Sequence, residues 1–347
     1  MVNTNDSKTF SQEKAGITPY EGPNRWPGEK VAVLVPCHNE EATIGAVVRD
    51  FRAYLPEAIV YVYNNNSTDK TVEVALEVGA VVREESFPGK GNVVRRMFSD
   101  IEADIYVLVD GDDTYHAASS PKLIQHLIDK NLDMVNGARI TEIAEAYRFG
   151  HQFGNWLLTT LVATIFGNQF RDMLSGYRIF SKRFTKSFPA LSTGFEIETE
   201  LTVHALELRM PVDEIDTPYK ERPEGSVSKL STYKDGFRIL KTIALLVKEE
   251  RPFQFFSGIA LALLFTSLIA GWPVISEYID TGLVPRLPTA ILASGLMILS
   301  FASFVCGLIL DTVTLGRREM KRMSYLRIPG TGPDCHSVPT KEASHQK

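Results

Sequence analysis

Three carboxylates stand within four residues in the stretch "VLVDGDDTYH", directly after an apolar run. Asp110, Asp112 and Asp113 repel one another at this spacing, so stability alone does not account for them. A hard divalent cation relieves such repulsion, and Mg²⁺ or Mn²⁺ prefers one or two carboxylates together with phosphate oxygens. Gly111 lets the backbone approach a ligand closely. The alternative is an acidic turn in which Asp112 or Asp113 caps the following helix.

Two more polar patches follow apolar runs in the same way. The patch "PCHNEE" comes after "VAVLV", and the patch "NNNSTD" comes after "IVYVY". Runs of β-branched residues that end in turn-forming residues are typical of strands. In parallel sheets, ligands bind beyond the carboxyl ends of the strands. The three patches therefore predict one ligand site at one edge of a sheet.

The elements that would position these patches alternate between strand and helix. This alternation predicts an α/β fold in which a mostly parallel sheet carries helices on both faces. The predicted strands are Val31–Val35, Ile59–Tyr63, Ile105–Val109 and, more weakly, Met134–Asn136, and the predicted helices are Glu41–Tyr54, Thr71–Val78, Gly91–Ile101 and Ser120–Lys130.

The composition excludes several classes of protein. The 347 residues carry a net charge of −5, which argues against a nucleic-acid-binding protein. Three cysteines are too few for a disulfide framework. Residues 1–29 are polar and lack the apolar core of a signal peptide, so we expect a flexible lead-in.

Two long runs near the C-terminus contain no charged residue, Phe253–Trp272 and Leu287–Leu310. About 20 apolar residues cross the core of a bilayer as a helix, so the runs predict a transmembrane hairpin. The alternative is a pair of buried core helices. Basic residues lie outside the hairpin at both ends, within Lys241–Arg251 and Arg317–Arg322. Basic flanks stay cytoplasmic, so we expect an integral membrane protein whose termini and N-terminal domain face the cytoplasm.

Six motifs occur in a fixed order: "VLVPCHNEEATI", "NNNSTDKT", "FPGKGNVVRR", "VLVDGDDTY", "VNGAR" and "RDMLSGYRIFSKR". Across residues 30–315 the chain resembles family 2 glycosyltransferases of the GT-A, Rossmann-like fold. With the hairpin it is most similar to the polyprenyl-phosphate glycosyltransferases, the group that includes dolichol-phosphate mannose synthase. The resemblance implies a catalytic domain at 30–234, an amphipathic interfacial helix at 235–251, two transmembrane helices within 252–315 and a basic cytoplasmic tail at 316–347.

The resemblance also implies which residues bind the nucleotide sugar. Asp110 and Asp112 occupy the positions that hold Mg²⁺ or Mn²⁺ and the diphosphate, and Thr114 stands where related enzymes often have Gln. Lys90, in "GKG", opens a helix and could face a donor phosphate. The donor-binding positions are Pro36, His38 (where the family usually has Tyr), Glu40, Asn65, Lys90, Asp110, Gly111 and Asp112.

Basic residues at family positions are expected to gather phosphates. Arg139 matches a family Arg near the donor. Arg171, Ser175 and Arg178 match the family segment that binds the donor diphosphate and the acceptor phosphate. We expect these three residues to act in catalysis together with Arg139 and Asp112. In the loop before the membrane part, Arg222 and Lys229 are the further candidates for a lipid phosphate, because Arg suits bidentate and Lys point-charge contacts. The alternative for this loop is a solvated charged surface.

The asparagine patch departs from the family pattern. Where the family has "DDGSTD", this chain has Asn64 and Asn65 in place of the acids and Asn66 in place of the Gly. Asn tolerates the left-handed backbone, and its amide can still bind a base edge or a hydroxyl. The missing negative charge would suit an anionic donor such as a uronic acid, or the change is neutral within the same pocket.

Glu196, Glu198 and Glu200 stand where a loop meets a helix in "STGFEIETELTVHA". An acid here could act as general base toward a hydroxyl acceptor. A lipid phosphate is already ionised and needs no base, in which case these acids cap the helix or orient another group.

The sequence thus predicts inverting transfer of one sugar from a UDP- or GDP-sugar to a polyprenyl phosphate at the cytoplasmic face of the membrane. Two spans are few for enclosing a lipid, which leaves room for a homo-oligomer. One alternative is a membrane glycosyltransferase with a hydroxyl acceptor, in glycolipid or polysaccharide synthesis. The other is a catalytically idle subunit that binds a sugar nucleotide.

Overall fold

The computed structural model describes residues 25–140, 170–194, 196–220, 245 and 247–330. The chain divides into two compact units. The first comprises Met1–Lys229 with Ser324–Lys347, and the second comprises Leu230–Met323.

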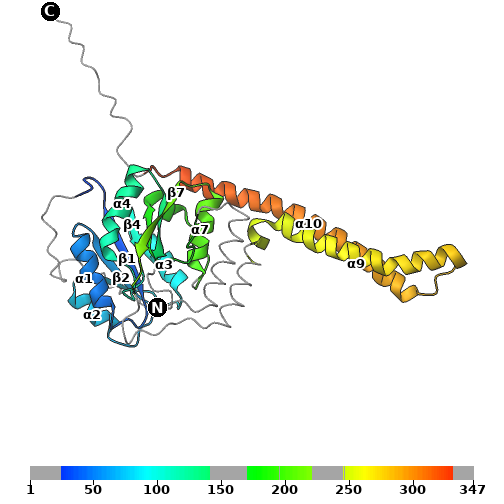
Figure 1. Cartoon of the computed structure of the whole chain (residues 1–347), viewed down its shortest axis with the longest axis horizontal. Helices are drawn as coiled ribbons and strands as arrows, with labels where there is room; N and C mark the ends of the chain where they lie inside the picture. Colours follow the sequence, from blue (N-terminus) through cyan, green and yellow to red (C-terminus); the bar gives the residue numbers. More distant parts are fainter. Residues whose placement is uncertain (1–24, 141–169, 195, 221–244, 246, 331–347) are drawn as a thin grey trace, which may run out of the picture. The chain divides into compact units, whose positions relative to one another are not determined.

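The first unit is built on a seven-stranded sheet with the order β3-β2-β1-β4-β6-β5-β7 (Figure 1). Its strands are β1 Val31–Cys37, β2 Ile59–Asn64, β3 Val81–Glu84, β4 Ile105–Leu108, β5 Met134–Ile140, β6 Arg178–Ser181 and β7 Val212–Pro218. β6 pairs antiparallel with both β4 and β5, whereas the other pairs in the sheet are parallel. The carboxyl ends of six strands therefore meet at one edge, and the segment that leads into β6 arrives at the same edge.

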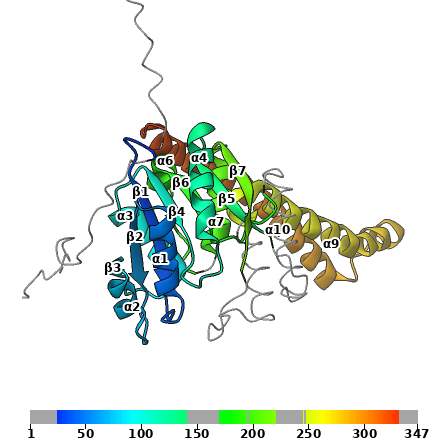
Figure 2. The same cartoon turned by 60° about the vertical axis from the view of Figure 1, so that its left-hand side comes forward.

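Helices cover both faces of this sheet. The helices of the first unit are α1 Ile44–Tyr54, α2 Thr71–Glu77, α3 Lys90–Asp100, α4 Ser120–Asp129, α6 Lys182–Ser187 and α7 Ile197–Glu207. Val107 of β4 packs in a core with side chains of α1 and α4. Tyr106 points the other way, because side chains alternate along a strand, and meets Phe98 of α3 edge-on. Figure 2 shows the sheet between these helices.

The predicted α/β fold with a mostly parallel sheet is confirmed, and the four strands and four helices predicted from the alternating pattern each overlap an observed one. Most of the expected interfacial helix at 235–251 lies outside the described residues. Three strands were not predicted. β3 and β6 have only four residues each, and β6 begins with a buried arginine. β7, "VDEIDTP", carries three acids and ends in proline, a composition that is depleted in strands.

The second unit contains two long helices, α9 Pro252–Thr281 and α10 Leu287–Leu326, of which α10 ends in the first unit. Both are long and apolar enough to cross a membrane, with mean hydropathies of 2.0 and 2.2 in their most apolar windows. Only 17% of each window is buried inside the protein, which argues against the alternative of core helices.

The helix ends differ from the expected ones. α9 passes through Pro273 and ends at Thr281, so most of the stretch between the two apolar runs, 273–286, is helical. A proline removes one N–H donor, and the helix can continue where neighbouring groups satisfy the backbone. α10 continues to Leu326, into the part that was expected to be a tail. Charged residues ended the apolar runs in the sequence, but they do not end a helix.

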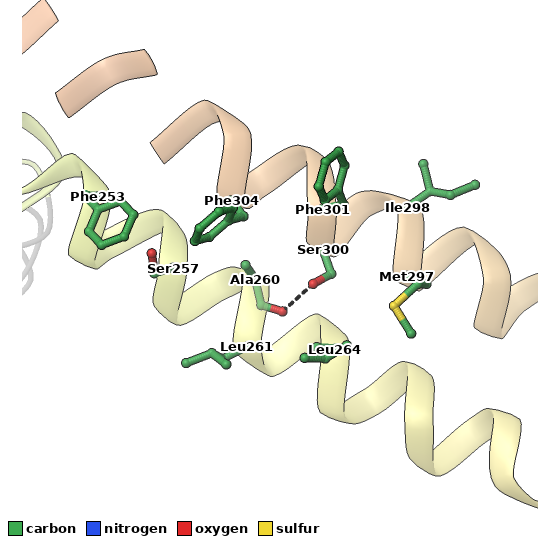
Figure 3. Close-up of a pocket in the computed structure, with 10 residues that line it drawn as sticks. All are labelled: Phe253, Ser257, Ala260, Leu261, Leu264, Met297, Ile298, Ser300, Phe301 and Phe304. Atoms are coloured by element: carbon green, nitrogen blue, oxygen red, sulfur yellow. Dashed lines mark hydrogen bonds between the residues drawn. The ribbon is translucent and has the colours of Figure 1, made fainter. Parts of the chain in front are cut away.

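α9 and α10 meet along a seam of small side chains. Ser267 Oγ donates to Ala293 O and Ser300 Oγ donates to Ala260 O, both at 2.7 Å; Figure 3 shows the second bond. Small residues let two membrane helices approach closely. Apart from Pro252 at the start of α9, the buried residues recur every seven positions, as in a coiled coil: Ala260, Ser267 and Val274 on α9, and Ala293, Ser300, Gly307 and Thr314 on α10.

Gly307 is the position where this seam has least room. A Cβ there would lie 3.1 Å from Phe256 Cβ, whereas a Cβ at Gly295 would meet nothing within 4 Å. We predict that Gly307→Leu destabilises the hairpin by about 1–3 kcal/mol, as overpacking does, and lowers the melting temperature of the protein in detergent. Gly295→Leu is the matched control and should melt like the wild type in far-UV circular dichroism. Equal melting of the two variants would contradict this seam.

Candidate active site

The first two polar patches meet, as predicted, where β1 and β2 end. Thr68 N donates to Asn39 Oδ1 at 2.7 Å, and Asn39 N donates to Ser67 Oγ at 2.9 Å. Glu40 N donates to Thr71 Oγ1 at 2.8 Å. Loops that satisfy each other's backbone groups in this way are held in one conformation.

The third patch joins them through Gly111. A Cβ at Gly111 would lie 2.0 Å from Glu40 Oε2, so no larger residue fits without movement. Thr43 Oγ1, at the start of α1, donates to Gly111 O at 2.7 Å. Glu40 and the turn that carries Asp110 and Asp112 are therefore in direct contact.

The donor positions expected on β1 lie at this edge as well. Pro36 is buried near the end of β1 and pairs with Tyr63. His38 is exposed beyond the end of the strand, and its Nδ1 lies 2.7 Å from Asn65 O. The structure thus places Pro36, His38 and Glu40 around the first patch, where a nucleotide pocket was expected.

The three asparagines hold a neighbouring segment rather than facing solvent together. Asn64 Nδ2 donates to the carboxylate of Glu84 at 3.0 Å, and Asn66 Nδ2 donates to Ser86 O at 2.9 Å. An acid has no N–H to donate, and at position 64 it would face Glu84 with like charge. Asn66 has a φ of 59°, a backbone that Asn tolerates. This arrangement explains the asparagines by the protein's own hydrogen bonds.

Asn65 uses its whole amide for the same purpose. Its Nδ2 donates to Glu85 O and to Phe87 O, both at 2.8 Å, and its Oδ1 accepts from Gly89 N at 2.7 Å. A direct contact between this amide donor and a nucleotide would have to break one of these bonds. Asn65 thus shapes the loop that leads to Lys90.

The glycines on either side of Lys90 allow a close packing of backbones. Gly89 has a φ of 120°, and a Cβ there would lie 2.1 Å from Thr193 O. A Cβ at Gly91 would lie 2.2 Å from Ser192 O. Gly91 N also donates to Thr193 O at 3.1 Å. Lys90 is therefore fixed at the first residue of α3 by contacts on both sides.

Lys90 bridges two carboxylates at the sheet edge. Its Nζ lies 2.5 Å from Asp110 Oδ1 and 2.5 Å from Glu198 Oε1. The side chains of Lys90 and Glu198 are 10% and 7% exposed. Burial disfavours the charged amine, but the two carboxylates outweigh burial and raise the pKa of Lys90 above its usual value. The expected donor-binding lysine and the expected metal-binding aspartate are thus in contact.

Asp112 is buried and held by Thr114, the residue at the family's Gln position. Thr114 Oγ1 donates to Asp112 Oδ1 at 2.6 Å. Among the described residues, no group of three or more His, Cys, Asp and Glu side chains could hold a metal ion. Two carboxylates, Asp110 and Asp112, fit Mg²⁺ or Mn²⁺ when phosphate oxygens complete the coordination.

The segment "RDMLSGYR" comes to the same edge because it precedes the antiparallel strand β6. A Cβ at Gly176 would lie 2.4 Å from Asp110 Oδ2. Ser175 is buried and its Oγ donates to Gly137 O at 2.6 Å. Arg178 is also buried, and it donates to Met173 O and Thr202 Oγ1; burial lowers its pKa to about 10. Both side chains shape the turn beside Asp110, so direct contact with a phosphate would require them to move.

The two remaining arginines of this group carry acidic partners. Arg139 makes a bidentate pair with Asp172, with both contacts at 2.7 Å. Burial opposes ionisation of Asp172, but Arg139 outweighs it and lowers the pKa of Asp172. Arg171, which is 69% exposed, pairs with Glu214 at 3.0 Å and with Asp216. The expected lipid-phosphate residues Arg222 and Lys229 lie outside the described residues.

Glu198 was not singled out among the three glutamates of its segment. Glu200 accepts hydrogen bonds from Leu191 N and Ser192 N, both at 2.8 Å, and so shapes the loop that packs on Gly91. In the sequence, the glycines on either side of Lys90 were the available signal for this contact, because glycine allows another backbone segment to come close to Lys90. The sequence does not show which segment supplies that backbone.

The role of Asn65 leads to a stability prediction. Asn65→Asp places a carboxylate against two carbonyl oxygens, so we expect the free energy of unfolding to fall by at least about 1–3 kcal/mol. Asn66→Asp is the matched control, because it loses only one exposed hydrogen bond, to Ser86 O, and Asp also tolerates a positive φ. Denaturant melts of both variants measure the difference, and equal stability of Asn65→Asp and wild type would refute this role.

Comparison with known proteins identifies the family. Residues 32–188 match the model of glycosyl transferase family 2. The chain is 31% identical over 301 residues to glycosyltransferase AglJ of Haloferax volcanii, covering 86% of this chain and 98% of that protein. It is 29% identical over 224 residues to a dolichyl-phosphate hexose transferase of the same organism, covering 64% and 96%.

A solved structure supports the fold. Glucosyl-3-phosphoglycerate synthase of Mycobacterium tuberculosis, in complex with Mn²⁺, uridine diphosphate and glucosyl-3-phosphoglycerate, superposes with a TM-score of 0.54 at 22% identity, covering 64% of this chain and 80% of that chain. The chain therefore belongs to glycosyl transferase family 2 and is a glycosyltransferase.

Proposed function

We propose that the protein transfers one sugar, with inversion, from a nucleoside-diphosphate sugar to a polyprenyl phosphate at the cytoplasmic face of a membrane. The observation that carries the proposal is the meeting of Lys90, Asp110 and the "RDMLSGYR" segment at one sheet edge, in a chain that also has a membrane-length hairpin. The sheet-edge site suits an anionic sugar donor, and the hairpin suits a lipid acceptor.

The donor side rests on the charges at the ends of β1 and β4. A divalent cation held by Asp110 and Asp112 would neutralise charge that develops on the leaving diphosphate. Lys90 would add a fixed positive charge next to it and needs no reorganisation during the reaction. A UDP- or GDP-sugar fits this site, and the fold relative described above was solved with Mn²⁺ and uridine diphosphate.

The proposed acceptor, a polyprenyl phosphate, needs no general base. A phosphate monoester is already ionised at neutral pH, so its oxygen can attack the anomeric carbon directly. The observed contacts of Glu198 and Glu200 are with Lys90 and with backbone N–H groups, which suits orientation rather than proton abstraction. The dolichyl-phosphate hexose transferase named above is a relative whose name states a lipid phosphate.

Arg139 and Arg171 would receive phosphates by exchange. In the structure their guanidinium groups pair with Asp172 and with Glu214 and Asp216. A phosphate offers the same bidentate geometry as a carboxylate, so an incoming phosphate can take over one of these contacts. Arg171 is the more exposed of the two and is our candidate for the lipid phosphate. Arg222 and Lys229, which lie outside the described residues, are the further candidates for the same lipid phosphate.

The hairpin would keep the acceptor close to the site at high local concentration. The basic flanks support an orientation with both termini and the catalytic domain on the cytoplasmic side of the inner or plasma membrane. A homo-oligomer would help two helices to enclose a lipid.

The first prediction from this function concerns the reaction itself. Purified protein in detergent, with Mn²⁺, a polyprenyl phosphate and a panel of UDP- and GDP-sugars, should release nucleoside diphosphate from one donor. Release should require the lipid and should stop when EDTA removes the cation. Release that needs a hydroxyl-bearing acceptor instead would favour glycolipid or polysaccharide synthesis. Nucleotide binding without release from any donor would favour the idle subunit.

The second prediction separates Asp112 from its neighbour. Asp112→Asn removes a proposed cation ligand, and we expect kcat/KM to fall by about 10²-fold or more, as when a transition-state contact is lost. Asp113→Asn is the matched control: it removes the same charge one residue away, and Asn tolerates the φ of 55° at this position. Its kcat/KM should stay within a few-fold of the wild type. Equal losses in both variants would mean that net charge, rather than coordination, matters here.

A further inference from the structure

Glu198 is a buried carboxylate in the first turn of α7, and Lys90 provides its counter-charge. Glu198 Oε1 lies 2.5 Å from Lys90 Nζ. Its other oxygen, Oε2, is buried and accepts no hydrogen bond from any residue that the structure describes. A buried carboxylate is unfavourable unless a nearby positive charge balances it. Glu198 therefore depends on Lys90, and the geometry makes the dependence mutual.

We propose that Glu198 is a positioning residue of the donor site, which retains the Lys90 ammonium when Asp110 turns from Lys90 to a divalent cation. The inference rests on the proposed function, because it takes Asp110 and Asp112 as the cation ligands. It assigns Glu198 neither to base catalysis nor to capping.

Lys90 and a divalent cation would compete for one carboxylate, that of Asp110. Lys90 donates to Asp110 Oδ1, an oxygen that a divalent cation bound to Asp110 would also use. Two positive charges on the same carboxylate repel each other, so cation binding weakens the contact between Lys90 and Asp110. A buried ammonium that lost its only carboxylate would be strongly unfavourable. Glu198 supplies a second carboxylate, so Lys90 can loosen its hold on Asp110 without leaving the site.

The third N–H of Lys90 then matters for the donor. An ammonium has three donors, and Asp110 and Glu198 take two of them. Among the described residues the third has no partner. While Glu198 retains the ammonium, this third N–H can reach a donor phosphate beside the cation. Glu200 has a different role, since its carboxylate binds Leu191 N and Ser192 N.

The test measures Mn²⁺ binding to the purified full-length protein in detergent, from the paramagnetic resonance signal of free Mn²⁺, without nucleotide. Glu198→Gln leaves Lys90 only Asp110, so the apparent Kd for Mn²⁺ should rise by about fivefold or more, within the usual range of coupling between sites. Lys90→Met removes the competitor, so the Kd should fall. In the double variant the Glu198→Gln effect should shrink to less than about twofold, because its target is gone.

Two further variants keep the test decisive. Glu196→Gln removes the same charge two residues away and should leave Mn²⁺ binding unchanged. If Lys90→Met does not fold, Glu198→Asp replaces it, because this variant keeps the charge but shortens the reach to Lys90. A Kd raised as in Glu198→Gln then supports the contact, and a wild-type Kd shows that only charge matters and overturns the proposal.

The outcomes separate this proposal from the proposed function. Tight Mn²⁺ binding by the wild type, with an unchanged Kd in Glu198→Gln or an equal rise in the Lys90→Met background, overturns the role of Glu198 alone. A wild type that binds no Mn²⁺, with or without uridine diphosphate, overturns the cation site of the proposed function and this inference with it.

Discussion

The site depends on one buried ammonium held between two carboxylates. Lys90 must reach Asp110 at the end of β4 and Glu198 at the start of α7, which lie far apart in the sequence. A buried charge network is stable only when every member has its partner in place. The glycines around Lys90 and the amide of Asn65 serve this requirement, because they bring the backbone of Lys90 to a fixed position.

The direction of β6 explains why one motif of the candidate site precedes its strand whereas the others follow theirs. Motifs that follow parallel strands reach the carboxyl edge of the sheet as those strands end. The "RDMLSGYR" segment reaches the same edge although it precedes its strand, because β6 runs opposite to β4 and β5. A chain can thus add a basic segment to a parallel-sheet site by reversing one strand, and Gly176 gives that segment room beside Asp110.

The fold and the place of the site could be predicted from local pattern, because strand, turn and helix signals lie within a few residues of each other. The four predicted strands and the three polar patches belong to this class. The roles of Asn65, Arg178 and Glu198 could not be predicted, because each depends on a partner that the fold brings from elsewhere: the 85–89 loop, the interior beside α7 and Lys90. The asparagines show this most clearly, since their likeness to family acids pointed to the nucleotide and their contacts are with the protein.

The pairing of charges also bears on how such a site binds anions. Lys90, Arg139 and Arg171 each contact a carboxylate in the structure. These pairs keep the basic side chains extended and ordered, so less conformational entropy is lost when a phosphate arrives. The pairs also restrict which ligands bind, because a ligand must offer each basic group oxygens that replace those of its carboxylate partner. A diphosphate accompanied by a cation would meet this condition: its oxygens would replace carboxylate oxygens on the basic groups, and the cation would bind Asp110, the carboxylate that Lys90 contacts. The acids beside the basic residues thus favour ligands that bring both charges together.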